Sequence, residues 1–175
     1  MTKHILIDGK KARSAVRCRE IYYCGNDMST QFFTASVAEE LLLNTGLTEE
    51  NKSHARNQLK EFWLYEYRDA HPSTLSGGQK QRLAIACAIF SGRGILILDE
   101  PTAPLSNTET EELFRIVKHL HETENIAILF ISHRLNEILE VCENYTVMRN
   151  GKMIDTTPVT GETTTKEIVE KMLGR

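Results

Sequence analysis

Hydrophobic residues are spaced differently in the two halves of the chain. Between Thr48 and about Tyr65 they recur at helical spacing, which predicts a helix. Ser36 and Ser76 each stand three residues before Glu or Gln, the capping-box pattern at the start of a helix. They predict helices that run to about residues 43 and 90. Short strands are expected over His4–Gly9 and Ile21–Cys24, so the first half of the chain is mainly helical.

In the second half, apolar runs of strand length alternate with amphipathic stretches. The expected strands are Ile95–Leu98, Ile126–Ile131 and Tyr145–Arg149, and the expected helices are Thr108–His121, Leu135–Cys142 and Thr165–Leu173. Asn150-Gly151 predicts a hairpin turn into Lys152–Asp155. The continuous apolar run at 95–98 is typical of a strand buried on both faces. The alternation predicts a parallel sheet, in which ligands bind beyond the carboxyl ends of the strands.

Composition narrows the class of protein without indicating its chemistry. The 175 residues include 21 Lys+Arg and 24 Asp+Glu, a net charge of −3, with 41% hydrophobic residues. These values are ordinary for one globular domain, with or without a small subdomain, and they exclude the overall basic excess typical of nucleic-acid binding. No apolar run is long enough to span a bilayer. Four cysteines lie far apart without a CxxC pair, as expected for reduced thiols in a cytosolic protein.

Two polar segments are candidates for chemistry. Asp99 and Glu100 directly follow the strand 95–98, where Asp99 suits a Mg²⁺ ligand and Glu100 can orient or deprotonate an attacking water. The alternative is a turn in which both acids face solvent. In the segment 75–82, LSGGQKQR, two glycines would let backbone N–H groups at a helix start approach an anion. The alternative for this segment is an ordinary capped helix.

Three motifs together carry a resemblance to a known family. LSGGQKQR at 75–82, ILILDEPT at 95–102 and FISHR at 130–134 resemble the signature motif, Walker B motif and switch histidine of ATP-binding-cassette (ABC) ATPases. Their order also matches. Residues 22–37 resemble cation and vitamin importers of the energy-coupling-factor type, whereas 102–106 and 132–137 resemble sugar importers. Both subfamilies stay open.

The resemblance implies a role for each matching residue. Asp99 would support Mg²⁺, Glu100 would be the general base and His133 would sense the γ-phosphate, although a lone histidine after a strand is more often structural. The signature residues would contact ATP bound to the opposite subunit of a dimer; they are Ser76, Gly77, Gly78 and Gln79.

The chain also departs from the family pattern. Nothing in it matches GxxxxGK[ST], the loop that cradles the phosphates. We therefore expect the chain to begin after that loop, and the isolated chain to be impaired in hydrolysis. Asn26 stands where the Q-loop glutamine is expected, with a shorter reach for nucleotide and metal, and Ser106 replaces the usual aspartate after Walker B.

These observations predict an α/β P-loop NTPase fold with a RecA-like parallel sheet, incomplete at its N-terminus, and a helical signature subdomain. Residues 1–34 would be a remnant of the core, 35–90 the helical subdomain and 91–175 the core with Walker B and the switch histidine.

The predicted function is ATP hydrolysis for solute import, with ATP and Mg²⁺ as cofactors, at the cytoplasmic face of the membrane. The predicted partners are a second ATPase subunit and transmembrane permease subunits, without nucleic acid. The alternatives are an impaired or regulatory partner that supplies only the signature motif, and an ABC ATPase unrelated to transport.

Overall fold

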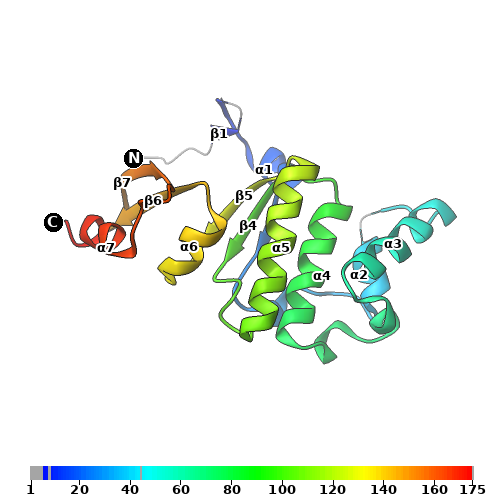
Figure 1. The fold of residues 1–175 in the computed structure, drawn as a ribbon. Helices are drawn as coiled ribbons and strands as arrows, with labels where there is room; N and C mark the ends of the chain where they lie inside the picture. Colours follow the sequence, from blue (N-terminus) through cyan, green and yellow to red (C-terminus); the bar gives the residue numbers. More distant parts are fainter. Residues whose placement is uncertain (1–5, 8, 44, 175) are drawn as a thin grey trace. The chain divides into compact units, whose positions relative to one another are not determined.

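The computed structural model describes residues 6–7, 9–43 and 45–174 (Figure 1). It forms two compact units, Met1–Leu129 and Phe130–Arg175. Each unit has its own core and is described by itself.

The first unit opens with small elements that the sequence pattern predicts only in part. Strands β1 (Leu6–Ile7) and β2 (Lys10–Lys11) pair antiparallel, and helix α1 (Ser14–Glu20) leads into β3 (Ile21–Cys24). The pattern predicts β1 within 4–9 and also β3, but it misses β2 and α1. Residues 4, 5 and 8 lie outside the described residues.

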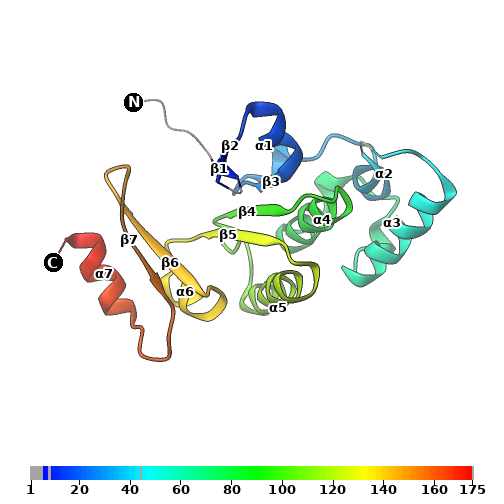
Figure 2. The same ribbon diagram turned by 90° about the horizontal axis from the view of Figure 1, so that it is seen from above.

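The middle of the first unit is helical, as expected. It contains α2 (Val37–Leu42), α3 (Glu49–Glu61) and α4 (Gly77–Phe90), with short 3-10 turns η1 (Met28–Thr30), η2 (Tyr65–Tyr67) and η3 (Pro72–Thr74). The Ser36 and Ser76 side chains cap α2 and α4, which confirms both predicted helix starts. In Figures 1 and 2, α2 and α3 lie on the side of α4 that faces away from the sheet.

Helix α3 ends earlier than predicted. The pattern extends the helix to about Tyr65, but Trp63 adopts the left-handed conformation, with φ +53°. The N–H of Leu64 then bonds back to the carbonyl of Leu59 at 2.7 Å, the hydrogen bond that closes a helix end of the Schellman type. The prediction is wrong here because apolar spacing does not reveal a C-terminal cap that lacks glycine.

The predicted parallel sheet is present. Strands β4 (Ile95–Asp99) and β5 (Ala127–Ile131) flank α5 (Asn107–Glu124), and the strand order is β3-β4-β5. Strands β3 and β4 run parallel, with Cys24 opposite Leu98. Burial alternates along β4, with Leu96 at 1% and Leu98 at 0% exposure while the residues between them are half-buried. The prediction of a strand buried on both faces is therefore wrong.

The core of the first unit lies between the sheet and the helices beside it. Much of α4 is buried, and α5 turns one apolar stripe inward. In Figures 1 and 2, α4 and α5 are neighbours. The core residues contributed by these helices include Leu83, Ala84, Ile85, Ala86, Leu113, Phe114, Val117 and Leu120. Burial of this set fixes α4 and therefore its N-terminal end.

The second unit is an antiparallel hairpin with two helices. Strands β6 (Asn144–Arg149) and β7 (Lys152–Pro158) are joined at Asn150-Gly151, where both residues have positive φ, as predicted. Helices α6 (Leu135–Val141) and α7 (Thr165–Leu173) complete the unit. The expectation that 145–149 joins the parallel sheet is wrong, because β6 and β7 form a separate two-stranded sheet.

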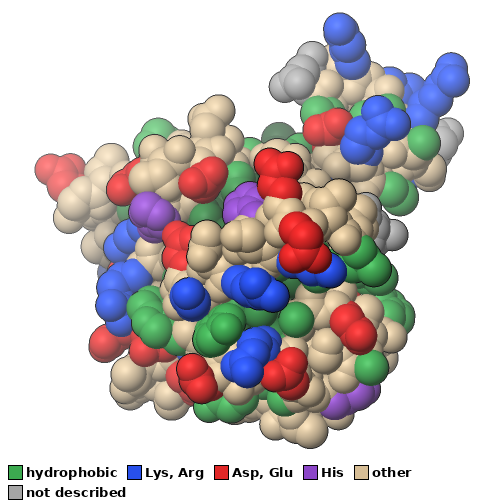
Figure 3. All heavy atoms as spheres, turned by 90° about the vertical axis from the view of Figure 1, so that its right-hand side faces the viewer, with side chains coloured by type: hydrophobic (Ala, Val, Ile, Leu, Met, Phe, Trp, Pro, Cys, Tyr) green, Lys and Arg blue, Asp and Glu red, His purple; other side chains and the backbone are tan. Residues whose placement is uncertain are grey.

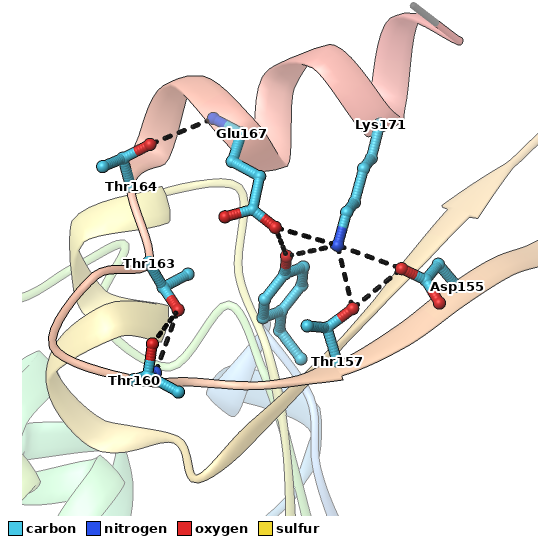
Figure 4. Close-up of polar contacts among 8 residues, drawn as sticks. Asp155, Thr157, Thr160, Thr163, Thr164, Glu167 and Lys171 are labelled. Carbon is cyan, nitrogen blue, oxygen red and sulfur yellow. Dashed lines mark hydrogen bonds and ion pairs between the residues drawn. The ribbon is translucent and has the colours of Figure 1, made fainter.

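A polar cluster centred on Lys171 ties α7 to the hairpin (Figure 4). The ammonium contacts the Tyr145 hydroxyl at 2.8 Å, Asp155 at 3.0 Å, Thr157 at 2.9 Å and Glu167 at 3.0 Å. It lies beside a small apolar core of Tyr145, Val147 and Ile168. Three buried residues are few for a core, so the cluster is a major link between helix and hairpin.

None of the helices in the described part of the chain combines the length and apolar composition needed to cross a lipid bilayer.

Candidate functional site

The two acidic residues predicted as functional lie at the carboxyl end of β4. Asp99 is the last residue of the strand, and Glu100 follows it in the left-handed conformation, with φ +51°. Its carbonyl accepts a hydrogen bond from the N–H of Ala103 at 3.2 Å, and its Oε2 atom is buried. A non-glycine residue held in this conformation stores about 1–3 kcal/mol of strain, which is typical of functional turns. Glu100 is therefore held by its turn, unlike an acid on a free loop.

Tyr23 contacts Asp99 from the neighbouring strand, a contact that the sequence pattern does not predict. Its hydroxyl donates to Asp99 Oδ2 at 2.7 Å. This hydrogen bond raises the pKa of Tyr23, because a phenolate facing a carboxylate would be unfavourable. Tyr23 pairs with Ile97, two residues before Asp99. The alternation of side chains therefore puts Tyr23 and Asp99 on one face, but only the register reveals this.

Asn26 lies two residues beyond the end of β3 and is exposed. Because β3 and β4 are parallel, it follows the same edge of the sheet as Asp99 and Glu100. In the loop after it, Gln31 donates from Nε2 to the carbonyl of Tyr23 at 2.9 Å. This bond holds the loop against the end of β3.

The other end of this loop is held by Glu40, a residue that sequence reasoning missed. Glu40 is 6% exposed, and its Oε2 accepts from the N–H groups of Phe33 and Thr34, both at 2.9 Å, and from the Thr34 hydroxyl at 2.7 Å. The capping pattern pointed to its neighbour Glu39. A buried carboxylate with three donors is evident only from tertiary contacts.

The signature segment forms the start of α4. The Ser76 hydroxyl accepts from the N–H of Gln79 at 3.3 Å, and Gln79 Oε1 accepts from the N–H of Ser76 at 2.8 Å, which confirms the predicted capping box. Ser76 is exposed. Within the described residues, the N–H groups of Gly77 and Gly78 donate to no other group. Gly77 is half-buried and Gly78 is buried, so the start of this helix presents the positive end of its dipole mainly beside the exposed Ser76.

Both signature glycines lie against the segment that follows Glu100. A Cβ atom on Gly77 would lie 3.2 Å from Pro104, and one on Gly78 would collide with the Glu109 carboxylate. An ion pair between Arg82 and Glu112 at 2.9 Å joins α4 and α5 one turn further on. The sequence suggested that glycine permits approach to a ligand, and the structure adds a packing reason. The start of α4 is thus held against the start of α5.

His133 belongs to the second unit and is described within that unit alone. It is exposed in the turn between β5 and α6. Ser132 on one side of it donates to Glu137 at 2.9 Å and accepts from the N–H of Arg134 at 3.0 Å. These bonds fix the turn that carries His133.

The residues present fit a nucleotide with its metal. In the described part of the chain, no three acids, histidines or cysteines form a metal cluster. Mg²⁺ is commonly bound by one or two carboxylates together with phosphates and waters, and Asp99 supplies such a carboxylate. The first turn of a helix suits a phosphate oxygen, and α4 begins at the exposed Ser76.

Surface charge does not suggest an extended polyanion site on the helical side of the first unit. Figure 3 shows Lys and Arg side chains interspersed with Asp and Glu over this face. Mixed signs favour local recognition of an anion by specific groups over attraction by a broad field.

Comparisons with known proteins agree with these features. The family model described as ABC transporter matches residues 2–103. The ribose import ATP-binding protein RbsA of Bacillus subtilis is 37% identical over 141 residues, which cover 79% of this chain and 28% of that protein. The methionine import ATP-binding protein MetN 1 of Oenococcus oeni is 38% identical over 135 residues, 77% of this chain and 39% of that protein. The chain thus spans well under half the length of these curated relatives.

A solved structure supports the same fold. That of cbiO1 from Clostridium perfringens, part of the ABC transporter complex cbiONQ, matches with a TM-score of 0.79 and 28% identity, covering 97% of this chain and 71% of that one. The predicted α/β P-loop NTPase fold with a parallel sheet is therefore confirmed.

Proposed function

Because this chain belongs to the ABC transporter family, as an ATPase of the importer type, we propose that it contributes a signature motif and a Walker B motif to an ATP site shared between two subunits. The observation that carries this proposal is the start of α4, where Ser76 is exposed and the N–H groups of Gly77 and Gly78 belong to the first turn, whose N–H groups have no partners within the helix. These groups would bind the terminal phosphate of ATP held mainly by the second subunit. The 175 residues contain no GxxxxGK[ST] loop, and at this shared site the phosphate cradle would belong to the second subunit, whose nucleotide the start of α4 contacts.

The residues at the end of β4 would act on the nucleotide bound to this subunit. Bound Mg²⁺ offsets the charge on the phosphates. Asp99 would hold the metal or one of its waters, and Glu100 would take the proton of the attacking water. Asn26 would contact the nucleotide or metal from the loop after β3, and His133 would donate to the γ-phosphate.

This function assigns a role to each part of the chain. Residues 35–90 would form the helical subdomain that carries the signature, between core segments 1–34 and 91–175. The relatives named above are import proteins. We therefore infer that the partners are transmembrane permease subunits and a second ATPase subunit, and that the complex acts at the cytoplasmic face of the membrane. The transported solute class, sugar or cation and vitamin, stays open.

A matched pair of serine variants tests the signature role. Aspartate caps helices as well as serine, so Ser76→Asp preserves the start of α4 but adds a negative charge where phosphate would bind. Like charges about 4 Å apart repel by roughly 1–4 kcal/mol near a protein surface, so ATP binding should weaken about ten-fold or more. The measurement is a Mg²⁺-ATP titration of the ¹⁵N-labelled chain in complex with its unlabelled second subunit, followed by the amide shifts of Gly77 and Gly78. Ser36→Asp makes the same change at the start of α2, where Ser36 caps the helix, and should leave ATP binding unaltered.

Equal effects of the two variants would refute the signature role. A second variant, Glu100→Gln, tests the enzyme role by phosphate release from the complex purified through a tag on this chain. Loss of the general base should lower turnover about 10²-fold or more while ATP binding is retained. If Ser76→Asp abolishes turnover and Glu100→Gln does not change it, the chain supplies only the signature motif in trans.

A further inference from the structure

The hydrogen bond between Tyr23 and Asp99 joins two neighbouring strands at the predicted catalytic edge. The hydroxyl of Tyr23 on β3 reaches diagonally to Oδ2 of Asp99 at the end of β4, at 2.7 Å. The Tyr23 side chain is 54% exposed, so its ring contributes little to the core. Tyr23 is a large aromatic residue, yet it is not buried in the core. Its hydroxyl is instead hydrogen-bonded to a candidate metal-binding carboxylate, which suggests that Tyr23 orients that carboxylate.

The adjacent residue, Tyr22, has different surroundings from those of Tyr23. Tyr22 points to the opposite face of β3, where it lines a cavity of about 250 Å³ and the Arg93 guanidinium lies 5.1 Å from its ring centroid. Burial raises the pKa of Tyr22. Tyr22 therefore packs, whereas Tyr23 is bonded to Asp99. The two residues are matched in chemistry and differ in the face on which they lie.

The backbone of Tyr23 is also fixed. Its carbonyl accepts the hydrogen bond from Gln31, and its neighbour Cys24 is fully buried opposite Leu98. The hydroxyl is thus presented from a well-anchored strand end. Its position at the strand end directs it to Oδ2 of Asp99, to which it donates at 2.7 Å.

We propose that Tyr23 is a positioning residue for the cation site: its hydroxyl holds Oδ2 of Asp99 and leaves Oδ1 available to Mg²⁺ or a metal-bound water. This inference rests on the proposed metal role of Asp99. Hydrogen bonds to a ligating carboxylate orient the ligand, and their loss typically weakens metal affinity 10- to 100-fold. Because Tyr23 is half exposed, the effect lies near the lower end of that range.

The test uses the full chain without nucleotide and Mn²⁺ alone as the probe. Mn²⁺ prefers the same oxygen ligands as Mg²⁺ and broadens the amide signals of nearby residues, among them Leu98. Tyr23→Phe should raise the Mn²⁺ concentration for half-maximal broadening about ten-fold. Tyr22→Phe removes the same hydroxyl from the next residue and should leave that concentration unchanged. The midpoint of thermal unfolding of Tyr23→Phe should stay close to that of the wild type. A lower midpoint would be expected if Tyr23 had only a structural role.

The outcomes separate this inference from the proposed function. Asp99→Asn should abolish the broadening at Leu98; if it does not, the metal role of Asp99 fails and the inference fails with it. If Asp99→Asn abolishes broadening but Tyr23→Phe matches Tyr22→Phe, or binds Mn²⁺ more tightly, only the role of Tyr23 is overturned. A weakening confined to Tyr23→Phe supports it.

Discussion

The two units use charged residues in different ways. In the second unit, the Lys171 ammonium contacts two carboxylates, a phenol and a threonine hydroxyl, so opposite charges neutralise one another. At the end of β4 in the first unit, two consecutive carboxylates are brought together, and Asp99 accepts its hydrogen bond from an uncharged phenol. The first arrangement stabilises a small unit, and the second concentrates negative charge that a cation would balance.

Backbone conformation follows the same division. In the second unit, positive φ occurs at Asn150 and Gly151, two residue types that tolerate it. Among the described non-glycine residues of the first unit it occurs at Asn125, which tolerates it, and at Trp63 and Glu100, which do not. Backbone strain of this kind at Glu100 is typical of functional turns. Four substitutions test this comparison.

The largest loss of stability is expected at Glu40. Like the Lys171 cluster, this acid of the first unit forms several hydrogen bonds at once. Glu40→Ala would remove the buried acceptor of three part-buried hydrogen bonds from Phe33 and Thr34, each worth about 0.5–1.5 kcal/mol. Glu39→Ala is the matched control, since Glu39 is exposed and accepts one bond at 3.2 Å. Urea unfolding followed by circular dichroism measures both. Equal destabilisation by the two variants would show that the loop anchor is unimportant.

Gly78→Ala should have the next largest effect. The new methyl group would displace the Glu109 carboxylate, which caps α5 through Ser106, and crowding of this kind costs about 1–3 kcal/mol. Removal of the obstacle in the Glu109→Ala background should make Gly78→Ala nearly neutral. Unfolding free energies of the four proteins give this double-mutant cycle. Additive effects would contradict the contact.

Lys171→Met should lower the midpoint of thermal unfolding of the second unit by several degrees. Lys166→Met on the same helix is the control, because Lys166 is largely exposed and its only ion pair in the described residues, with Glu170, measures 4.0 Å. The difference should shrink at high salt, which screens exposed charges. Identical midpoints for the two variants would show that the Lys171 cluster adds no stability.

Lowering the pH should weaken the Lys171 cluster and so destabilise the second unit. The Thr157 hydroxyl and then Lys171 lower the pKa of Asp155, and Lys171 and then Tyr145 lower that of Glu167. A lowered pKa in the folded state contributes stability above the ordinary values, 3.8 for Asp and 4.5 for Glu, and this contribution is lost as the pH falls through the folded values. The unfolding midpoint of the second unit should therefore drop with acidification, and less steeply in Lys171→Met. Equal slopes would contradict the ion pairs.

The smallest effect is a gain in stability. Trp63→Gly should raise the free energy of unfolding of the first unit by about 1 kcal/mol, because glycine adopts the left-handed conformation without strain. Asn125→Gly makes the same change at the end of α5, where φ is +53°, and should gain less, since asparagine already tolerates this conformation. Urea unfolding distinguishes them. A loss of stability in Trp63→Gly would show that the tryptophan side chain outweighs its backbone strain.

Local patterns predicted most elements of the fold and one part of the site. The capping box at Ser76 and Gln79 depends on residues three apart, so spacing was sufficient to find it. The acids at the end of β4 followed from an apolar run that stops at Leu98. Tyr23 could not be found this way, because its contact with Asp99 joins residues 76 positions apart through a strand register that no local pattern encodes.

The sequence by itself determined where α2 and α4 begin, which segment ends in adjacent carboxylates, and which family the three motifs indicate, because these properties depend on short-range spacing. Only the tertiary structure decided that β6 leaves the parallel sheet, that Glu40 anchors the loop after β3, and that a tyrosine holds Asp99. These contacts join groups far apart in the chain, and their energy exists only once the chain has packed.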